Sequence, residues 1–111
     1  MASEGLHEPA DRMSEATIDM HRALISLIEE LEAIDWYHQR IEATDDGTLA
    51  AVLTNSRDDE KEHASMTLEW IRRHDPALDA QLRRFLFTTD PLGPVGNGQS
   101  SLGMGGLRGA R

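Results

Sequence analysis

The sequence contains no cysteine, so neither a disulfide framework nor a thiolate metal site is possible. Any metal ion would have to be held by carboxylates and imidazoles. The chain also lacks an apolar run near the roughly 20 residues that a membrane span needs. Residues 1–8 lack the basic and apolar regions of a signal peptide. These absences argue against a membrane role and make the cytoplasm the expected compartment.

Basic residues are also scarce. Lysine and arginine together number 11 against 20 aspartates and glutamates, which gives a formal net charge of −9. A surface of this sign repels nucleic acid and anionic membranes, and it suits cations. With 111 residues the chain can form one small domain at most, and a small domain buries only a limited core. Self-association is therefore expected.

The apolar spacing is helical throughout, and no segment shows the alternation of a β-strand. A long helix is predicted from Met13 to about Ile41, and a second from about Thr48 to Arg73. Between them, residues 44–48 have turn chemistry, with Gly47 free to take positive φ. A third, shorter helix follows, with Asp75 as its cap and Pro76 as its first residue. The predicted fold is all-α, an antiparallel helical hairpin plus a short C-terminal helix.

After Phe87 the composition changes to glycine, proline, serine and asparagine, which is typical of a flexible tail. The chain is thus divided into a helical domain, residues 1–87, and a tail, residues 88–111. Within the tail, Leu102–Arg108 restores a few apolar side chains on a glycine-rich background. Two interpretations stay open for this segment: a disordered terminus with scattered hydrophobes, or a short linear motif that reaches a groove on another protein.

Glu60 and His63 lie three residues apart and therefore share one face of the second helix, among its apolar positions. A carboxylate and an imidazole that face inward need a partner, because burying an unpaired charge is unfavourable. A metal ion supplies such a partner. A hydrogen-bonded Glu–His pair, or an arginine from a neighbouring helix, is the plainer alternative.

Glu30 is a second inward carboxylate, on the shoulder of the first helix's apolar stripe. Counted from the turn near Asp46 it lies about as far back as Glu60 lies forward, so a hairpin is expected to bring the two side by side. Bundles that hold two metal ions use one Glu from each of two helices and a Glu-x-x-His from each of the other two. One chain supplies one of each kind. A second copy would complete the site and form a four-helix bundle.

A second apolar line on the first helix, made of Ile18, Ile25 and Trp36, lies away from the main stripe and implies neighbours from other copies. Trp36 and Tyr37 either flank the metal site or are plain packing. Glu29 and Glu32 form either a weak patch for approaching cations or a solvated helix face.

Three segments together resemble the encapsulated ferritin family, the cargo ferroxidases of encapsulin nanocompartments: Glu29–Tyr37, Asn55–His63 and Met66–Trp70. The resemblance covers roughly His7 to Phe87. It implies ferritin-like hairpin subunits assembled as an annular decamer built from dimers, with each di-iron centre shared between two subunits. The implied activity is oxidation of Fe²⁺ to Fe³⁺ by dioxygen. The iron would then be stored as mineral inside the encapsulin compartment.

The resemblance also assigns roles to single residues. It implies that Glu30, Glu60 and His63 are the iron ligands. Tyr37, which it implies is part of the catalytic centre, lies beside Trp36. The outer metal site on the approach route is implied at Glu29 and Glu32.

The tail segment Leu102–Arg108 resembles the targeting peptide that docks such cargo in the encapsulin shell, with Gly106 where a serine is commoner. Two other functions are compatible with the residues themselves. One is a metal-free acidic helical adaptor, and the other is a bundle that binds zinc or manganese without redox chemistry.

Overall fold

The computed structural model of the protein describes residues 5–93. A short 3-10 turn precedes three α-helices, and no strand occurs in this part of the chain. The all-α prediction is therefore confirmed, as is the order of a hairpin and a short third helix. No helix within residues 5–93 is long and apolar enough to cross a membrane. The elements are η1 (Ala10–Arg12), α1 (Glu15–Ala43), α2 (Gly47–His74) and α3 (Pro76–Phe85).

The chain separates into two compact units, Met1–Asp79 and Ala80–Arg111. The first unit holds the helical hairpin of α1 and α2, which carries all the predicted metal ligands. The second begins inside α3. Just after α3, Phe87 has a φ of 59° in the left-handed region, a conformation that ends the helix.

Capping side chains explain where the helices begin. Asp46 accepts hydrogen bonds from the backbone N–H groups of Thr48 and Leu49 at 2.9 and 3.1 Å, which satisfies donors that the first turn of α2 leaves free. Similar bonds start α1 at Ser14 and α3 at Asp75. The predicted cap at Asp75, followed by Pro76, is thus confirmed.

The turn differs from the prediction at Gly47. Thr44, Asp45 and Asp46 make the connection, and the Asp46 N–H donates to the Thr44 hydroxyl at 3.1 Å. Gly47 is already the first residue of α2 and has no positive φ. The Asp46 cap starts the helix immediately, so the freedom of glycine is not used here.

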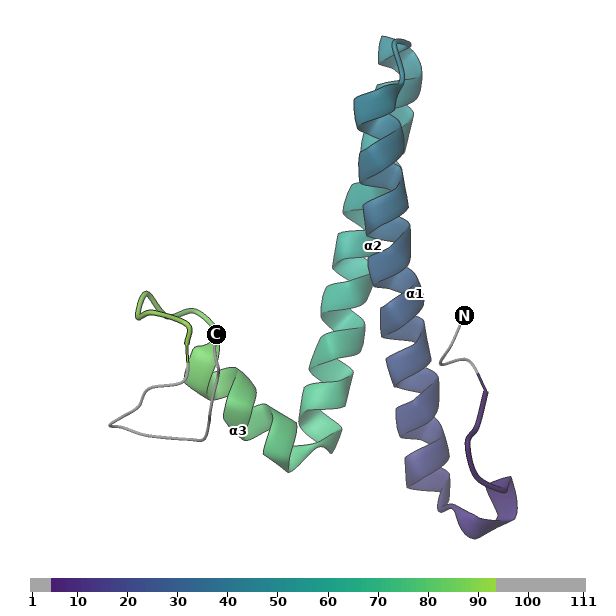
Figure 1. Ribbon diagram of the computed structural model, residues 1–111, viewed down its shortest axis with the longest axis vertical. Coiled ribbons are helices and arrows are strands. Elements are labelled where there is room, and N and C mark those ends of the chain that lie inside the picture. Colours follow the sequence, from purple (N-terminus) through teal and green to yellow (C-terminus); the bar gives the residue numbers. More distant parts are fainter. Residues whose placement is uncertain (1–4, 94–111) are drawn as a thin grey trace. The chain divides into compact units, whose positions relative to one another are not determined.

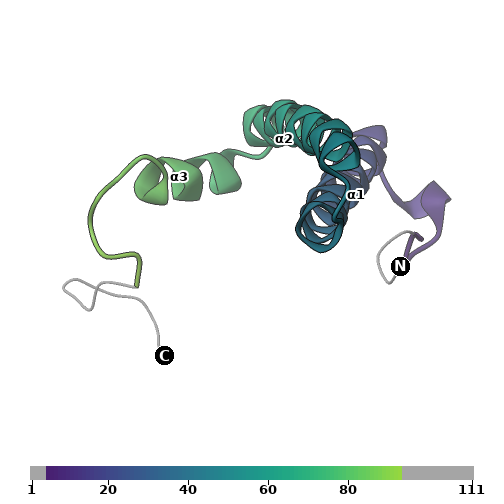
Figure 2. The ribbon, with the colours of Figure 1, turned by 90° about the horizontal axis from the view of Figure 1, so that it is seen from above.

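The helices α1 and α2 run antiparallel and lie side by side (Figures 1 and 2). Side-chain hydrogen bonds link them: the Thr67 hydroxyl reaches Glu30, and the Arg57 guanidinium reaches His38. Their shared core is small. Among residues 5–93 the buried hydrophobic side chains are Ala64, which is 8% exposed, and Ile71, which is 1% exposed.

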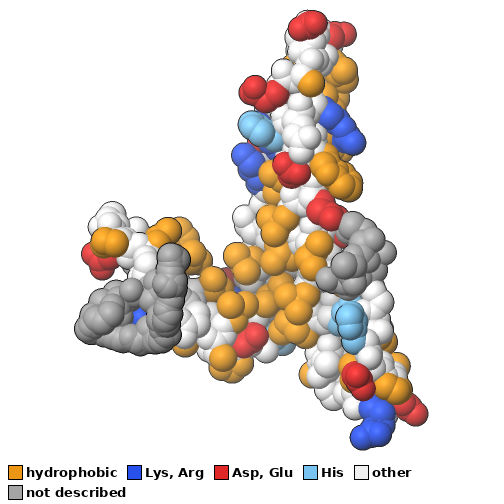
Figure 3. All heavy atoms as spheres, in the orientation of Figure 1, with side chains coloured by type: hydrophobic (Ala, Val, Ile, Leu, Met, Phe, Trp, Pro, Cys, Tyr) orange, Lys and Arg blue, Asp and Glu red, His pale blue; other side chains and the backbone are white. Residues whose placement is uncertain are grey.

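Much of the hairpin's apolar surface stays exposed, and Figure 3 shows hydrophobic side chains gathered over the middle of the hairpin. On α1, Leu31 is 53% exposed and Trp36 is 49% exposed; on α2, Met66 and Val52 are each 58% exposed. Of the predicted second apolar line, Trp36 is exposed, whereas Ile18 and Ile25 are half-buried. Exposed apolar surface of this extent is typical of a chain that packs against further copies or partners.

Candidate metal centre

Glu30 is half-buried on the side of α1 that faces α2. Its Oε2 accepts a hydrogen bond from the Thr67 hydroxyl at 3.3 Å. Its Oε1 is buried and has no hydrogen-bond partner among residues 5–93. An acceptor in this state costs about 1–3 kcal/mol, and more if it is charged. The Glu30 carboxylate is therefore a ligand whose free oxygen a cation would satisfy.

Glu60 and His63 lie together on α2, as their spacing predicts. The His63 Nδ1 is 3.6 Å from the Glu60 Oε1. The Glu60 side chain is 27% exposed and the His63 side chain is 51% exposed. The separation is longer than a good hydrogen bond, so both groups can turn toward a shared ion. In the single chain the Glu60–His63 pair is not closed off from solvent.

The axial levels of the two carboxylates differ from the prediction. Glu30 lies level with Thr67, and Thr67 follows Glu60 by seven positions on α2, about 10 Å along the helix axis. Equal counting from Asp46 missed this offset because Cα–Cβ bonds tilt toward the N-terminus of each helix. In an antiparallel hairpin the α1 side chains lean away from the turn, whereas the α2 side chains lean toward it.

Glu30 and the Glu60–His63 pair therefore do not complete a metal site within one hairpin. Consistent with this, no three acidic, histidine or cysteine side chains in residues 5–93 converge on a point that could hold a metal ion. The structure places the predicted ligands on adjoining helices but leaves the ligand set of a single chain incomplete.

The outer acidic residues are separate from this group. Glu29 is exposed and Glu32 is half-buried. Glu29 is one position before Glu30 and Glu32 is two positions after it, and residues at these spacings do not share a helix face. The outer metal site predicted for this pair remains a prediction.

Tyr37 follows Glu30 by two turns of α1 and is half-buried. The Arg40 guanidinium lies over its ring, 5.7 Å from the centroid, within the range of a cation–π contact. Neighbouring Trp36 is more exposed. The role of Tyr37 in the chemistry also stays a prediction.

Sequence analysis missed the side-chain contacts between the helices. The Arg57 Nη1 donates to the His38 Nδ1 at 3.2 Å. Because a guanidinium cannot accept, this contact requires the unprotonated Nδ1 of the imidazole. Like the Thr67–Glu30 bond, it joins residues far apart in the chain, so no local motif could have indicated it.

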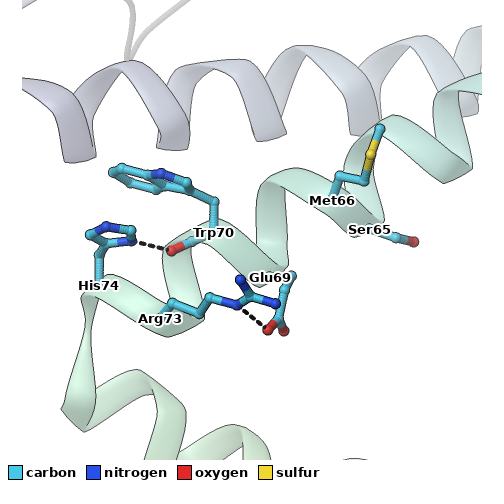
Figure 4. A pocket seen from close by; sticks show the side chains of 6 residues that line it. All are labelled: Ser65, Met66, Glu69, Trp70, Arg73 and His74. Carbon is cyan, nitrogen blue, oxygen red and sulfur yellow. Dashed lines mark hydrogen bonds and ion pairs between the residues drawn. The ribbon is translucent and has the colours of Figure 1, made fainter.

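A surface hollow of about 480 Å³ lies near the end of α2 (Figure 4), lined by Ser65, Met66, Glu69, Trp70, Arg73 and His74. The Trp70 and His74 rings stack there with centroids 3.9 Å apart, and the His74 Nδ1 donates to the Trp70 carbonyl at 2.7 Å. Hydrogen bonds from Arg72 and Arg73 lower the pKa of Glu69 to about 2. Guanidinium groups thus hold both oxygens of this carboxylate, which makes the hollow a poor metal site.

The predicted targeting segment Leu102–Arg108 lies outside the described residues.

Several known proteins are similar to this chain. Residues 5–89 match the EncFtn-like family. An encapsulated ferritin-like protein of Rhodospirillum rubrum is 42% identical over 97% of this chain and 91% of its own. A ferritin-like protein of Thermotoga maritima is 49% identical over 78% of this chain and 75% of its own.

A third relative covers less of the chain. The encapsulin nanocompartment cargo protein EncC of Myxococcus xanthus is 40% identical over 53% of this chain and 45% of its own. Among solved structures, a protein from Nitrosomonas europaea is 57% identical and superposes with a TM-score of 0.77, covering 79% of this chain and 97% of that one. The family match over residues 5–89 and the relative that is 42% identical over 97% of this chain together show that the chain belongs to the EncFtn-like family.

Proposed function

We propose that this protein oxidises Fe²⁺ to Fe³⁺ with dioxygen at a centre made by Glu30, Glu60 and His63 of two copies of the chain. We further propose that it works as iron-oxidising cargo inside an encapsulin compartment. The observation that carries the first proposal is the buried, unpartnered Oε1 of Glu30. The names of the relatives from Rhodospirillum rubrum and Myxococcus xanthus support the second.

The donor set suits the proposed substrate. Carboxylate oxygens and an imidazole nitrogen are ligands that iron accepts, and the chain has no thiolate that would favour a different metal. In this proposal Glu30 presents its free oxygen from α1, while Glu60 and His63 present theirs from α2. Two Fe²⁺ ions bound there would each give one electron to dioxygen, which would take up two protons and leave as hydrogen peroxide. The carboxylates would offset the positive charge of the ions.

A second copy is required because no three acidic or histidine side chains in residues 5–93 converge on one point. Two-fold symmetry doubles the set to two residues of each kind and lets Glu30 of one copy approach the Glu60–His63 pair of the other. The half-exposed His63 and the exposed apolar side chains of α2, such as Met66, fit a surface that another copy covers.

Fe²⁺ oxidation by purified variants tests this proposal. Glu30→Ala, Glu60→Ala and His63→Ala should each lose at least about tenfold in rate, since even residues that only support a metal ligand have effects of that size. Glu62→Ala is the matched control, because Glu62 is an exposed carboxylate on the same helix. It should oxidise Fe²⁺ at the unmodified rate.

The outcomes separate this function from its rivals. A folded His63→Ala protein with the unmodified rate would contradict the site. Stoichiometric zinc or manganese without Fe²⁺ oxidation would indicate a non-redox bundle. Purified protein that binds no metal at all would indicate a helical adaptor.

A further inference from the structure

We infer that Thr67 is a positioning residue of the iron centre: its hydroxyl holds one oxygen of Glu30 so that the other is presented to Fe²⁺. This inference rests on the proposed function, since it concerns how that centre binds its substrate. The starting observation is that the two oxygens of Glu30 differ. Oε2 accepts from the Thr67 hydroxyl at 3.3 Å, whereas Oε1 is buried without a partner in the described residues.

The location of Thr67 suits this role. It is half-buried on α2, one helical turn beyond His63 and two beyond Glu60. Residues at these spacings lie on one side of a helix. The Thr67–Glu30 bond therefore ties the single ligand of α1 to the same stretch of α2 that carries the other two ligands.

Other hydroxyl groups of α2 are used differently. Thr54 donates to the backbone carbonyl of Ala50 at 2.8 Å, and Ser65 donates to that of Lys61 at 2.8 Å. Such bonds to the carbonyl four residues earlier are the usual outlet for a hydroxyl in a helix. The Thr67 hydroxyl instead crosses to a carboxylate on the neighbouring helix. This contrast points to a function of the hydroxyl beyond stabilising its own helix.

The physical consequence is preorganisation. A glutamate side chain that is free to rotate must lose that freedom when it binds an ion. A hydrogen bond to Oε2 fixes the rotation of the carboxylate in advance and leaves the lone pairs of Oε1 for the metal. Partners of this kind hold metal ligands in orientation, and their removal typically weakens metal binding 10- to 100-fold.

The test measures Fe²⁺ binding by calorimetric titration under anaerobic conditions, on the full chain at one fixed protein concentration. Thr67→Val keeps the shape of the side chain and removes the donor, and it should weaken Fe²⁺ binding about 10- to 100-fold. Thr67→Ser restores a hydroxyl and should recover most of the affinity. Thr54→Val is the matched control, because it makes the same change on the same helix where the hydroxyl bonds only to backbone.

Turnover gives a second readout. With weaker binding, Thr67→Val should need a higher Fe²⁺ concentration for half-maximal rate while its maximal rate changes less. If Thr67→Val does not fold, Thr67→Ala removes the same donor from a half-exposed position and carries the same expectation. A merely structural role would lower the melting temperature of the metal-free protein and leave Fe²⁺ affinity unchanged.

Three results would overturn the inference. Thr67→Val could bind Fe²⁺ as tightly as the unmodified protein, Thr67→Ser could bind as weakly as Thr67→Val, or Thr54→Val could lose as much affinity as Thr67→Val. If the unmodified protein and Thr67→Val bind Fe²⁺ equally tightly, this inference fails but the proposed function stands. Unmodified protein that binds no Fe²⁺ would refute the proposed function and this inference with it.

Discussion

Binding of Fe²⁺ is expected to drive association of the chain, because one hairpin carries an incomplete ligand set. In residues 5–93 no three acidic or histidine side chains converge on one point, and the Oε1 of Glu30 is buried without a partner there. An ion that is held well only between two copies must favour the form in which both copies are present.

The size of the effect follows from mass action. At a free Fe²⁺ concentration about one hundred times the dissociation constant, each occupied site stabilises the associated form by about 2.7 kcal/mol, close to a hundredfold in the equilibrium. The small core makes such a contribution decisive. Within the described hairpin the buried hydrophobic side chains are those of Ala64 and Ile71, so a separate chain has little burial of its own.

Sedimentation velocity on chelator-treated protein measures this directly, with and without Fe²⁺ under anaerobic conditions. We expect a shift toward the larger species when Fe²⁺ is added. Glu30→Ala should abolish the shift, and Glu62→Ala should preserve it. The reasoning would be refuted if the metal-free protein were already fully associated on dilution, so that the exposed apolar surface alone drives assembly. It would also be refuted by a stable single chain that binds two ions.

The remaining predictions concern the core and the tail. Ile71→Ala should destabilise the protein by about 2–5 kcal/mol, because Ile71 is 1% exposed. Val52→Ala, at a 58% exposed position, should destabilise it clearly less. Thermal unfolding at one fixed protein concentration compares the two variants, and equal losses of stability would contradict the assignment of the core. Deleting residues from Leu102 onward should leave folding and Fe²⁺ oxidation unchanged but prevent co-purification with an encapsulin shell, and equal loading of full-length and shortened protein would rule out targeting by that segment.

The helices could be predicted from sequence because their signals are local. The 3.6-residue spacing of apolar side chains indicates the long helices, and Asp75 followed by Pro76 marks the start of α3. The Glu60–His63 pair is local in the same sense, since a spacing of three residues fixes its shared face. Gly47 misled the prediction because glycine permits positive φ without requiring it.

The relation between the helices could not be predicted in the same way. Helical periodicity gives the face on which a side chain lies, but not the axial level that the tip of that side chain reaches on a neighbouring helix. That level depends on the tilt of the side chains, which placed Glu30 beside Thr67 instead of Glu60. The Thr67 hydroxyl could not be assigned a role from the sequence, because its partner lies 37 positions away in the chain.

We propose that Fe²⁺ binds between two copies of the chain at Glu30, Glu60 and His63. Anomalous scattering at the iron edge, from crystals soaked anaerobically in Fe²⁺, would locate the bound ions. We expect a pair of iron peaks bounded by these three residues from each of two copies. Iron held by a single chain, or found only elsewhere such as the hollow beside His74, would contradict this proposal.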